Sequence, residues 1–234
     1  MESRPHDVVF FIWGENMERI IQGDCLEELK KLPDNSIDSI ITDPPFFCPA
    51  THYQSRVNWG RKWSDMSVLE HWWRLICDNL RRVLKPTGHI IVFCNSDSYP
   101  AFYPPMFNRW DKLVCLVWDK ERVGLGRIWR HQHELIIAGR NKGAYEPNDG
   151  VLRSDILRFK ATKSKDRKHP VEKPVELLAE LIKATTPPGG IVLDPFAGSG
   201  STLVAAKREG FNYVGIEKEA EYVKIANERL KLSV

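Results

Sequence analysis

Short β-branched apolar runs alternate with longer amphipathic stretches along most of the chain. The apolar runs predict strands over 18–22, 37–42, 89–94, 112–118, 133–139, 190–193 and 212–216. Apolar positions at three- and four-residue spacing predict helices over 25–32, 67–84, 173–186, 201–209 and 219–231. The turn sequences KPTG at 85–88 and TPPGG at 186–190 are expected to close two of these helices. This alternation favours an α/β domain with a mainly parallel sheet.

The length of 234 residues predicts one domain over residues 1–234. A hydrophobic content of 42% and a charged content of 28% are typical of folded chains and argue against wholesale disorder. The apolar runs are too short to cross a bilayer and no secretory signal is evident, so we expect a cytoplasmic protein. The five cysteines form no C-x-x-C pair, which predicts reduced thiols rather than a zinc site or a disulfide framework.

Two long segments have no predicted element, namely 46–66 and 140–168. Such segments inside a compact domain are typical of functional loops. We expect the first to be a mobile loop on the catalytic side. The second holds nine lysines and arginines against four acidic residues, in a chain whose net charge is only +3. Its charge predicts contact with a polyanion, with a solvated surface loop as the alternative, and we expect it to be poorly ordered in the free protein.

Residues 189–217 are predicted to form a strand, a glycine loop, a helix and a second strand. Gly198 and Gly200 allow a tight turn that can approach a ligand closely. Ser201 and Thr202 are predicted N-cap residues of the helix. The second strand ends at Glu217, an acidic residue at about the spacing that suits ribose hydroxyls.

The same loop departs from the dinucleotide pattern at two positions. Leu203 stands where a third glycine would be, and Asp194 puts a negative charge where a pyrophosphate would bind. A P-loop is excluded because no G-K-[S/T] follows. A carboxylate at the strand end suits an ammonium group, so the combination predicts S-adenosylmethionine, with a structural turn as the alternative.

The tetrapeptide Asp43-Pro44-Pro45-Phe46 follows the predicted strand 37–42. Asp43 could accept one N–H of a base amine and the carbonyl of Pro44 the other, with the double proline holding both acceptors in place. Phe46 could stack on a base held outside the duplex. The alternative is a plain strand-ending turn.

Together these motifs resemble the amino-methyltransferases of DNA, which act on adenine N6 or cytosine N4. The tetrad precedes the glycine loop, an order similar to the circularly permuted beta group. GDCLEELKKLPDNSIDSIITDPPF (23–46), RHQHELIIAGR (130–140) and HPVEKP (169–174) also resemble segments of this family. The resemblance implies a Rossmann-like methyltransferase fold with a mainly parallel seven-stranded sheet flanked by helices. It also implies that 140–168 is a short target-recognition segment.

The resemblance implies roles for individual residues as well. The catalytic residues would be Asp43, Pro44, Pro45 and Phe46. The cofactor-binding residues would be Asp24, Cys25, Asp43, Lys173, Asp194, Phe196, Gly198, Ser199, Gly200, Ser201, Thr202, Glu217 and Lys218. Lys173 and Pro174 would lie near the methionine end of the cofactor. No metal site is predicted.

The leading interpretation is methyl transfer from S-adenosylmethionine to N6 of a flipped adenine in double-stranded DNA, because an Asp-led tetrad usually goes with adenine in this family. Cytosine N4 is the second interpretation. An RNA or protein methyltransferase, or a non-catalytic nucleic-acid binder, stays open as a different class. The resemblance is compatible with a homodimer and with a cognate restriction endonuclease.

Overall fold

The computed structural model describes residues 18–46, 65–124, 128–161 and 172–233. Over these residues the chain forms an eight-stranded sheet of order β1-β8-β7-β2-β3-β5-β4-β6. The strands are β1 (Glu18–Gln22), β2 (Ile37–Thr42), β3 (Leu84–Cys94), β4 (Lys112–Asp119), β5 (His133–Arg140), β6 (Ile156–Arg158), β7 (Ile191–Asp194) and β8 (Asn212–Glu217). β5 pairs antiparallel with β3 and β4, and the other neighbouring strands pair in parallel.

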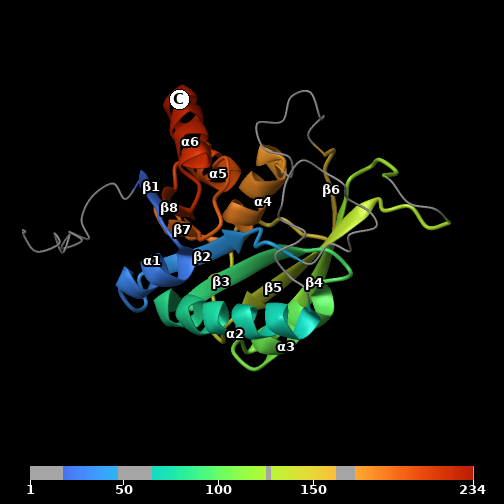
Figure 1. Ribbon diagram of the computed structural model, residues 1–234. Coiled ribbons are helices and arrows are strands. Elements are labelled where there is room, and N and C mark those ends of the chain that lie inside the picture. Colours follow the sequence, from blue (N-terminus) through green and yellow to red (C-terminus); the bar gives the residue numbers. More distant parts are fainter. Residues whose placement is uncertain (1–17, 47–64, 125–127, 162–171, 234) are drawn as a thin grey trace, which may run out of the picture.

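Helices cover both faces of the sheet (Figure 1). They are α1 (Cys25–Lys31), α2 (Met66–Val83), α3 (Tyr99–Phe107), α4 (Val175–Thr185), α5 (Ser201–Arg208) and α6 (Ala220–Leu232). α1, α2 and α3 pack on one face, where Trp73 and Phe102 are fully buried. α4, α5 and α6 pack on the other, around Leu203 and Ile182. Each face therefore has an apolar core, which confirms the α/β domain with a mainly parallel sheet expected from the sequence.

The structure differs from the sequence prediction at four elements. β3 begins at Leu84, so residues 85–88 lie within a strand, at an irregularity in its pairing with β2, rather than in a turn. α3 was not predicted because it contains Pro104 and Pro105. The short strand β6 lies inside the segment expected to be poorly ordered, and it raises the strand count from seven to eight. Predicted helix 173–186 begins later, at Val175.

The parallel part of the sheet positions the site. β2 pairs with β7, β7 with β8 and β8 with β1, all in parallel. The carboxyl ends of four strands therefore meet at one edge, where ligands bind in open α/β sheets. Among the described residues no helix is long and apolar enough to cross a membrane.

Candidate active site

Asp43 follows the fully buried strand β2 and lies at this edge. Its side chain is 18% exposed, and its Oδ2 accepts a hydrogen bond of 2.5 Å from Lys173 Nζ. Its Oδ1 is buried and has no hydrogen-bond partner among the described residues. A buried acceptor is costly without a partner, so this atom is suited to a donor that arrives with the substrate.

A row of alternating charges continues from Asp43 across the sheet. Lys173 Nζ lies 3.2 Å from Glu134 Oε2, and Lys120 Nζ donates to Glu134 Oε1 at 2.6 Å. Burial raises the pKa of Asp43 to about 6, and the charge of Glu134 adds to the rise while Lys173 opposes it. Although burial alone would lower the pKa of Lys173, its two carboxylate neighbours raise it. Lys173 is therefore charged and holds one oxygen of Asp43 in a fixed orientation.

Asp194 ends β7, the strand next to β2, and is 3% exposed. Its Oδ1 accepts hydrogen bonds from Thr42 Oγ1 at 2.8 Å and from the Phe196 backbone N–H at 3.1 Å. Burial raises the pKa of Asp194 to about 6, opposed by hydrogen bonds from Thr202 and Thr42. Asp194 forms no ion pair within the described part of the chain. A buried carboxylate surrounded by neutral donors is suited to a cationic ligand.

The glycine loop after β7 has the tight geometry that its sequence predicts. Gly198 and Gly200 have positive φ angles of 50° and 81°. A Cβ at Gly200 would lie 2.8 Å from the Cβ of Ala226 in α6, so glycine is required there by space as well as by conformation. Gly200 itself is the N-cap of α5, so the prediction that Ser201 and Thr202 cap this helix is wrong. Both are buried within its first turn.

Arg229 of α6 anchors the glycine loop through hydrogen bonds to Ser199 and Ser201. Its Nη1 donates to Ser199 O and Ser199 Oγ at 2.9 Å, and to Ser201 Oγ at 3.1 Å. Its Nη2 donates to Glu172 Oε1 at 2.7 Å. Glu172 immediately precedes Lys173, so one guanidinium ties the glycine loop to the segment that carries the lysine of the Asp43 site.

The ends of β8 and β1 carry the remaining predicted cofactor residues. Glu217 is 5% exposed, and its two carboxylate oxygens accept from the backbone N–H groups of Gly198 and Glu219 at 2.9 and 2.8 Å. Asp24 is the N-cap of α1 and lies 3.6 Å from Lys218 Nζ. Cys25 is the buried first residue of α1. The structure thus gathers these residues at the same sheet edge as Asp194.

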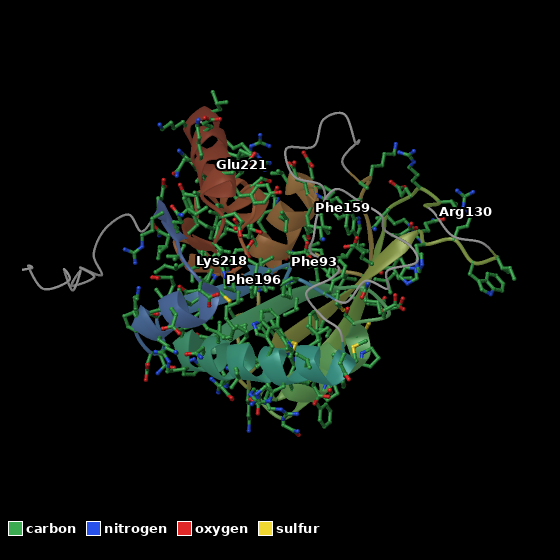
Figure 2. All side chains as sticks on the ribbon, viewed as in Figure 1. Phe93, Arg130, Phe159, Phe196, Lys218 and Glu221 are labelled. Atoms are coloured by element: carbon green, nitrogen blue, oxygen red, sulfur yellow. The ribbon has the colours of Figure 1, made fainter. Side chains whose placement is uncertain are left out.

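Two aromatic side chains border the edge. The Phe196 ring lies 5.6 Å from that of Trp72, on the α2 side of the sheet. Phe46 is half-buried and packs against the same apolar cluster. Figure 2 shows Phe196 and Lys218 along the edge with Phe93, whose ring lies 5.2 Å from Lys173 Nζ.

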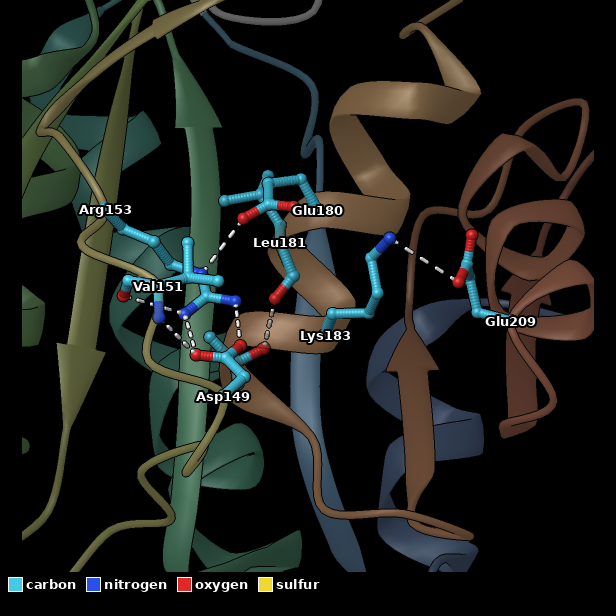
Figure 3. A network of polar contacts seen from close by, with 8 residues as sticks. Asp149, Val151, Arg153, Glu180, Leu181, Lys183 and Glu209 are labelled. Atoms are coloured by element: carbon cyan, nitrogen blue, oxygen red, sulfur yellow. Dashed lines mark hydrogen bonds and ion pairs between the residues drawn. The ribbon is translucent and has the colours of Figure 1, made fainter.

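The basic segment 140–168 is well anchored over residues 140–161, contrary to expectation. Arg153 Nη2 pairs with Asp149 at 2.5 Å and its Nε with Glu180 of α4 at 3.0 Å (Figure 3). Trp118 Nε1 donates to Phe159 O at 2.7 Å. Arg153 therefore forms an ion pair with α4, so part of the basic charge of this segment stabilises the fold. The lysines and arginine at 163–168 and most of the predicted catalytic-side loop, 47–64, lie outside the described residues.

Sequence reasoning did not identify Lys120, Glu134 and Arg229 as site residues. Glu134 lies in the segment 130–140, which resembles a segment of the family, and that was a usable signal. Lys120 and Arg229 belong to no motif, and only the fold brings them to the site. Within the described ranges no group of three or more histidine, cysteine, aspartate or glutamate side chains is arranged to hold a metal ion.

Comparison with known proteins identifies the family of the chain. The profile of the N6/N4 methyltransferase family, described as DNA methylase, matches residues 37–228. A protein of Escherichia coli strain K12 named as a methylase, YubD, is 35% identical over 218 residues, covering 92% of this chain and 90% of the relative. The chain belongs to the N6/N4 DNA methylase family. The type II methyltransferase M.HinfI of Haemophilus influenzae is 29% identical over 248 residues, covering 92% of this chain and 68% of the relative.

Solved structures share the fold. The complex of M1.HpyAVI with S-adenosylmethionine superposes with a TM-score of 0.67 at 24% identity, covering 91% of this chain and 98% of the other. The cytosine-N4-specific PvuII DNA methyltransferase superposes with a TM-score of 0.70 at 18% identity, covering 90% and 85%. The protein is a DNA methyltransferase of the N6/N4 family, and its cofactor is S-adenosylmethionine.

Proposed function

We propose that the protein methylates N6 of adenine in double-stranded DNA, on a base turned out of the duplex. The observation that carries methyl transfer to a base amine is the state of the Asp43 carboxylate. One of its oxygens is held by Lys173, and the other is buried without a described partner. It stands one strand away from Asp194, the carboxylate suited to the cofactor.

The exocyclic amine of a base is a weak nucleophile because its lone pair is delocalised into the ring. Asp43 Oδ1 accepts one amine N–H and the carbonyl of Pro44 accepts the other, which favours a pyramidal nitrogen. Lys173 fixes the carboxylate beforehand, so little reorganisation is needed when positive charge develops on the amine. Phe46 stacks on the extruded base. Asp43, as the acceptor of that N–H, takes the proton after methyl transfer.

The residues present fit S-adenosylmethionine. Asp194 would bind its ammonium group, because this buried carboxylate has no described cation beside it. Glu217 and the edge residues Asp24, Cys25 and Lys218 would bind the ribose and adenine. Phe196 and the loop from Gly198 to Thr202 would complete the site. When bound, the cofactor supplies an electrophilic methyl group for in-line displacement.

Cytosine N4 is the second candidate, because the structural neighbours include a cytosine-N4-specific enzyme. The same acceptors suit either amine, since both are planar exocyclic amines with two N–H groups. The Asp at the head of the tetrad favours adenine by resemblance to the family. The type II relative supports a role in restriction–modification, and a cognate endonuclease and a homodimer remain predictions.

The deciding experiment is a base identification. The protein is incubated with S-adenosylmethionine and unmethylated DNA, the DNA is digested to nucleosides, and the modified base is identified by mass. N6-methyladenine is the expected product. Detection of N4-methylcytosine alone would overturn the adenine assignment, and methylation of RNA but not DNA would overturn the DNA substrate.

A further inference from the structure

Residues 119–124 and 128–133, between β4 and β5, form the two sides of a projecting structure that we call the hairpin arm (Figure 1). Its two sides are joined by backbone hydrogen bonds from Lys120 N to Gln132 O at 3.0 Å and from Gly124 N to His131 O at 2.7 Å. The two sides are thus linked beyond the last ladder pair, Asp119 with His133, although the bond at Gly124 lies outside the register of β4 and β5. Residues 125–127 are outside the described part, and nothing below depends on them.

The base of the hairpin arm is connected to the active site. Lys120 Nζ pairs with Glu134, and Glu134 pairs with Lys173, which in turn holds Asp43. Trp129 stands five residues before Glu134, so at about 3.3 Å per residue it lies within roughly 17 Å of the arm's base. At about 3.4 Å per base pair, this corresponds to about five base pairs of duplex. The arm can therefore reach DNA close to a base bound at Asp43.

The outer part of the hairpin arm exposes large apolar side chains. Trp129 is 88% exposed, Ile128 86% and Val123 51%. By contrast, Trp73 and Trp118 in the body of the protein are 0% and 2% exposed. Three exposed apolar side chains within one short hairpin differ from single apolar residues scattered over a surface, and such clusters mark interaction sites.

The exposed charges near these apolar side chains, Arg122 and Arg130 against Glu121, are positive in sum and favour a polyanion. Arg122 and Arg130 are exposed and form no ion pair with a described residue. Arg130 Nε donates to Gly124 O at 2.8 Å, which orients its guanidinium at the outer end of the arm (Figure 2). Two arginines beside an exposed indole suit a partner that offers both anionic groups and flat apolar faces. Duplex DNA has both, as phosphates and stacked bases.

We propose that the hairpin arm contacts duplex DNA beside the methylated base, with Trp129 stacking into the disturbed base stack and Arg122 and Arg130 on the phosphates. This inference rests on the proposed function, because it assumes a DNA substrate from which a base is extruded. Unpairing and unstacking the target base costs free energy, and an inserted aromatic ring offsets part of that cost. The arm would thereby assist base extrusion.

The test compares wild type with Trp129→Ala on two duplexes that carry the methylated sequence, mapped beforehand on methylated plasmid DNA. In one duplex the target base is paired, and in the other its partner is replaced by an abasic site. We expect the variant to lose roughly tenfold to a hundredfold in kcat/KM on the paired duplex. Most of this loss should be recovered on the abasic duplex, where extrusion is easier. Leu232→Ala, at an equally open position (85% exposed) at the end of α6, is the matched control and should behave as wild type.

Each outcome has a defined meaning. Failure of wild type to methylate the paired duplex would count against the proposed function, whereas the ratio of variant to wild type tests the arm. Unchanged kcat/KM in Trp129→Ala, or equal loss on both duplexes, would overturn the wedge role. Conversion of a dimer to a monomer in sedimentation would instead assign the tip to contacts between copies of the chain. The phosphate contacts are tested separately with an Arg122→Gln, Arg130→Gln double variant. It should bind DNA more weakly, and the slope of the logarithm of its binding constant against the logarithm of the salt concentration should be smaller by about two units. An unchanged slope would overturn the phosphate contacts.

Discussion

Asp43 directly follows β2 and Asp194 ends the neighbouring parallel strand β7, and burial raises the pKa of each to about 6. Their surroundings differ. Asp43 faces the buried ammonium of Lys173, whereas Asp194 accepts hydrogen bonds from uncharged donors, among them Thr42 and the Phe196 backbone. Burial therefore acts on both carboxylates alike, but only Asp43 has a positive charge beside it in the described structure.

The difference separates their proposed roles. Asp43 already has a counter-charge, so it can stay ionised while one oxygen remains available to a neutral amine. Asp194 has none in the described structure, so a ligand that brings a positive charge gains the most there. The following changes test this division, beginning with the largest expected effect.

Replacing Asp43 with alanine should lower the rate of methyl transfer by at least about a hundredfold, because the amine loses its main acceptor. The dissociation constant for S-adenosylmethionine should stay close to that of wild type. Single-turnover methylation and calorimetric titration measure the two quantities. A normal rate in this variant would contradict the mechanism.

Replacing Asp194 with asparagine should have the opposite pattern. Loss of a charged hydrogen bond to the ammonium group should weaken S-adenosylmethionine binding by roughly ten- to a hundredfold. The rate at saturating cofactor should fall much less. Thr42→Val is the control, because it removes a hydrogen bond to Asp194 without removing the charge. If it weakened binding as much as Asp194→Asn, the charge would not be the cause.

The pH dependence of kcat at saturating cofactor should report Asp43, because bound ammonium keeps Asp194 ionised. The pKa of Asp43 is raised, so activity should fall as pH drops through about 6, where the carboxylate is protonated. Glu134→Gln should move this acidic fall in activity to lower pH, since Glu134 raises the pKa of Asp43. Lys173→Met should move it to higher pH, since Lys173 lowers that pKa.

Glu180→Gln provides the control for these pH profiles. It neutralises a carboxylate that pairs with Arg153 on the surface of α4, so the acidic fall in activity should stay in place. If Glu134→Gln and Glu180→Gln gave the same profile, the row of charges from Lys120 to Asp43 would have no influence on catalysis.

The smallest effect concerns the glycine loop beside Asp194. Gly200→Ala should lower the free energy of unfolding by about 1–3 kcal/mol, from backbone strain and from contact with Ala226. Gly143 has the same φ of 81° but no atom within 4 Å of an added Cβ. Gly143→Ala should therefore cost less, and urea unfolding measures the difference. Equal losses would mean that the contact with Ala226 adds nothing.

Much of this fold could be predicted from local sequence. β1 and β2 have the predicted bounds, and the other predicted elements differ by a few residues at their ends. α3 could not be predicted, because Pro104 and Pro105 are unfavourable inside a helix. Tertiary packing overrides that preference: Phe102 and Met106 are fully buried, and the Phe102 ring lies 4.8 Å from that of Trp73. β6 is too short for its pattern to be recognised, and it forms because β4 offers an edge.

The site shows the same division. The sequence by itself determined that Asp43 and Asp194 end buried strands and that Gly198 and Gly200 form the turn, because these features depend on neighbours along the chain. Only the tertiary structure decided that Lys173 faces Asp43, that Glu134 and Lys120 extend the row of charges, and that Arg229 holds the glycine loop. Charges act through space and most strongly where water is excluded, so partners far apart in sequence become visible only when folding buries them together.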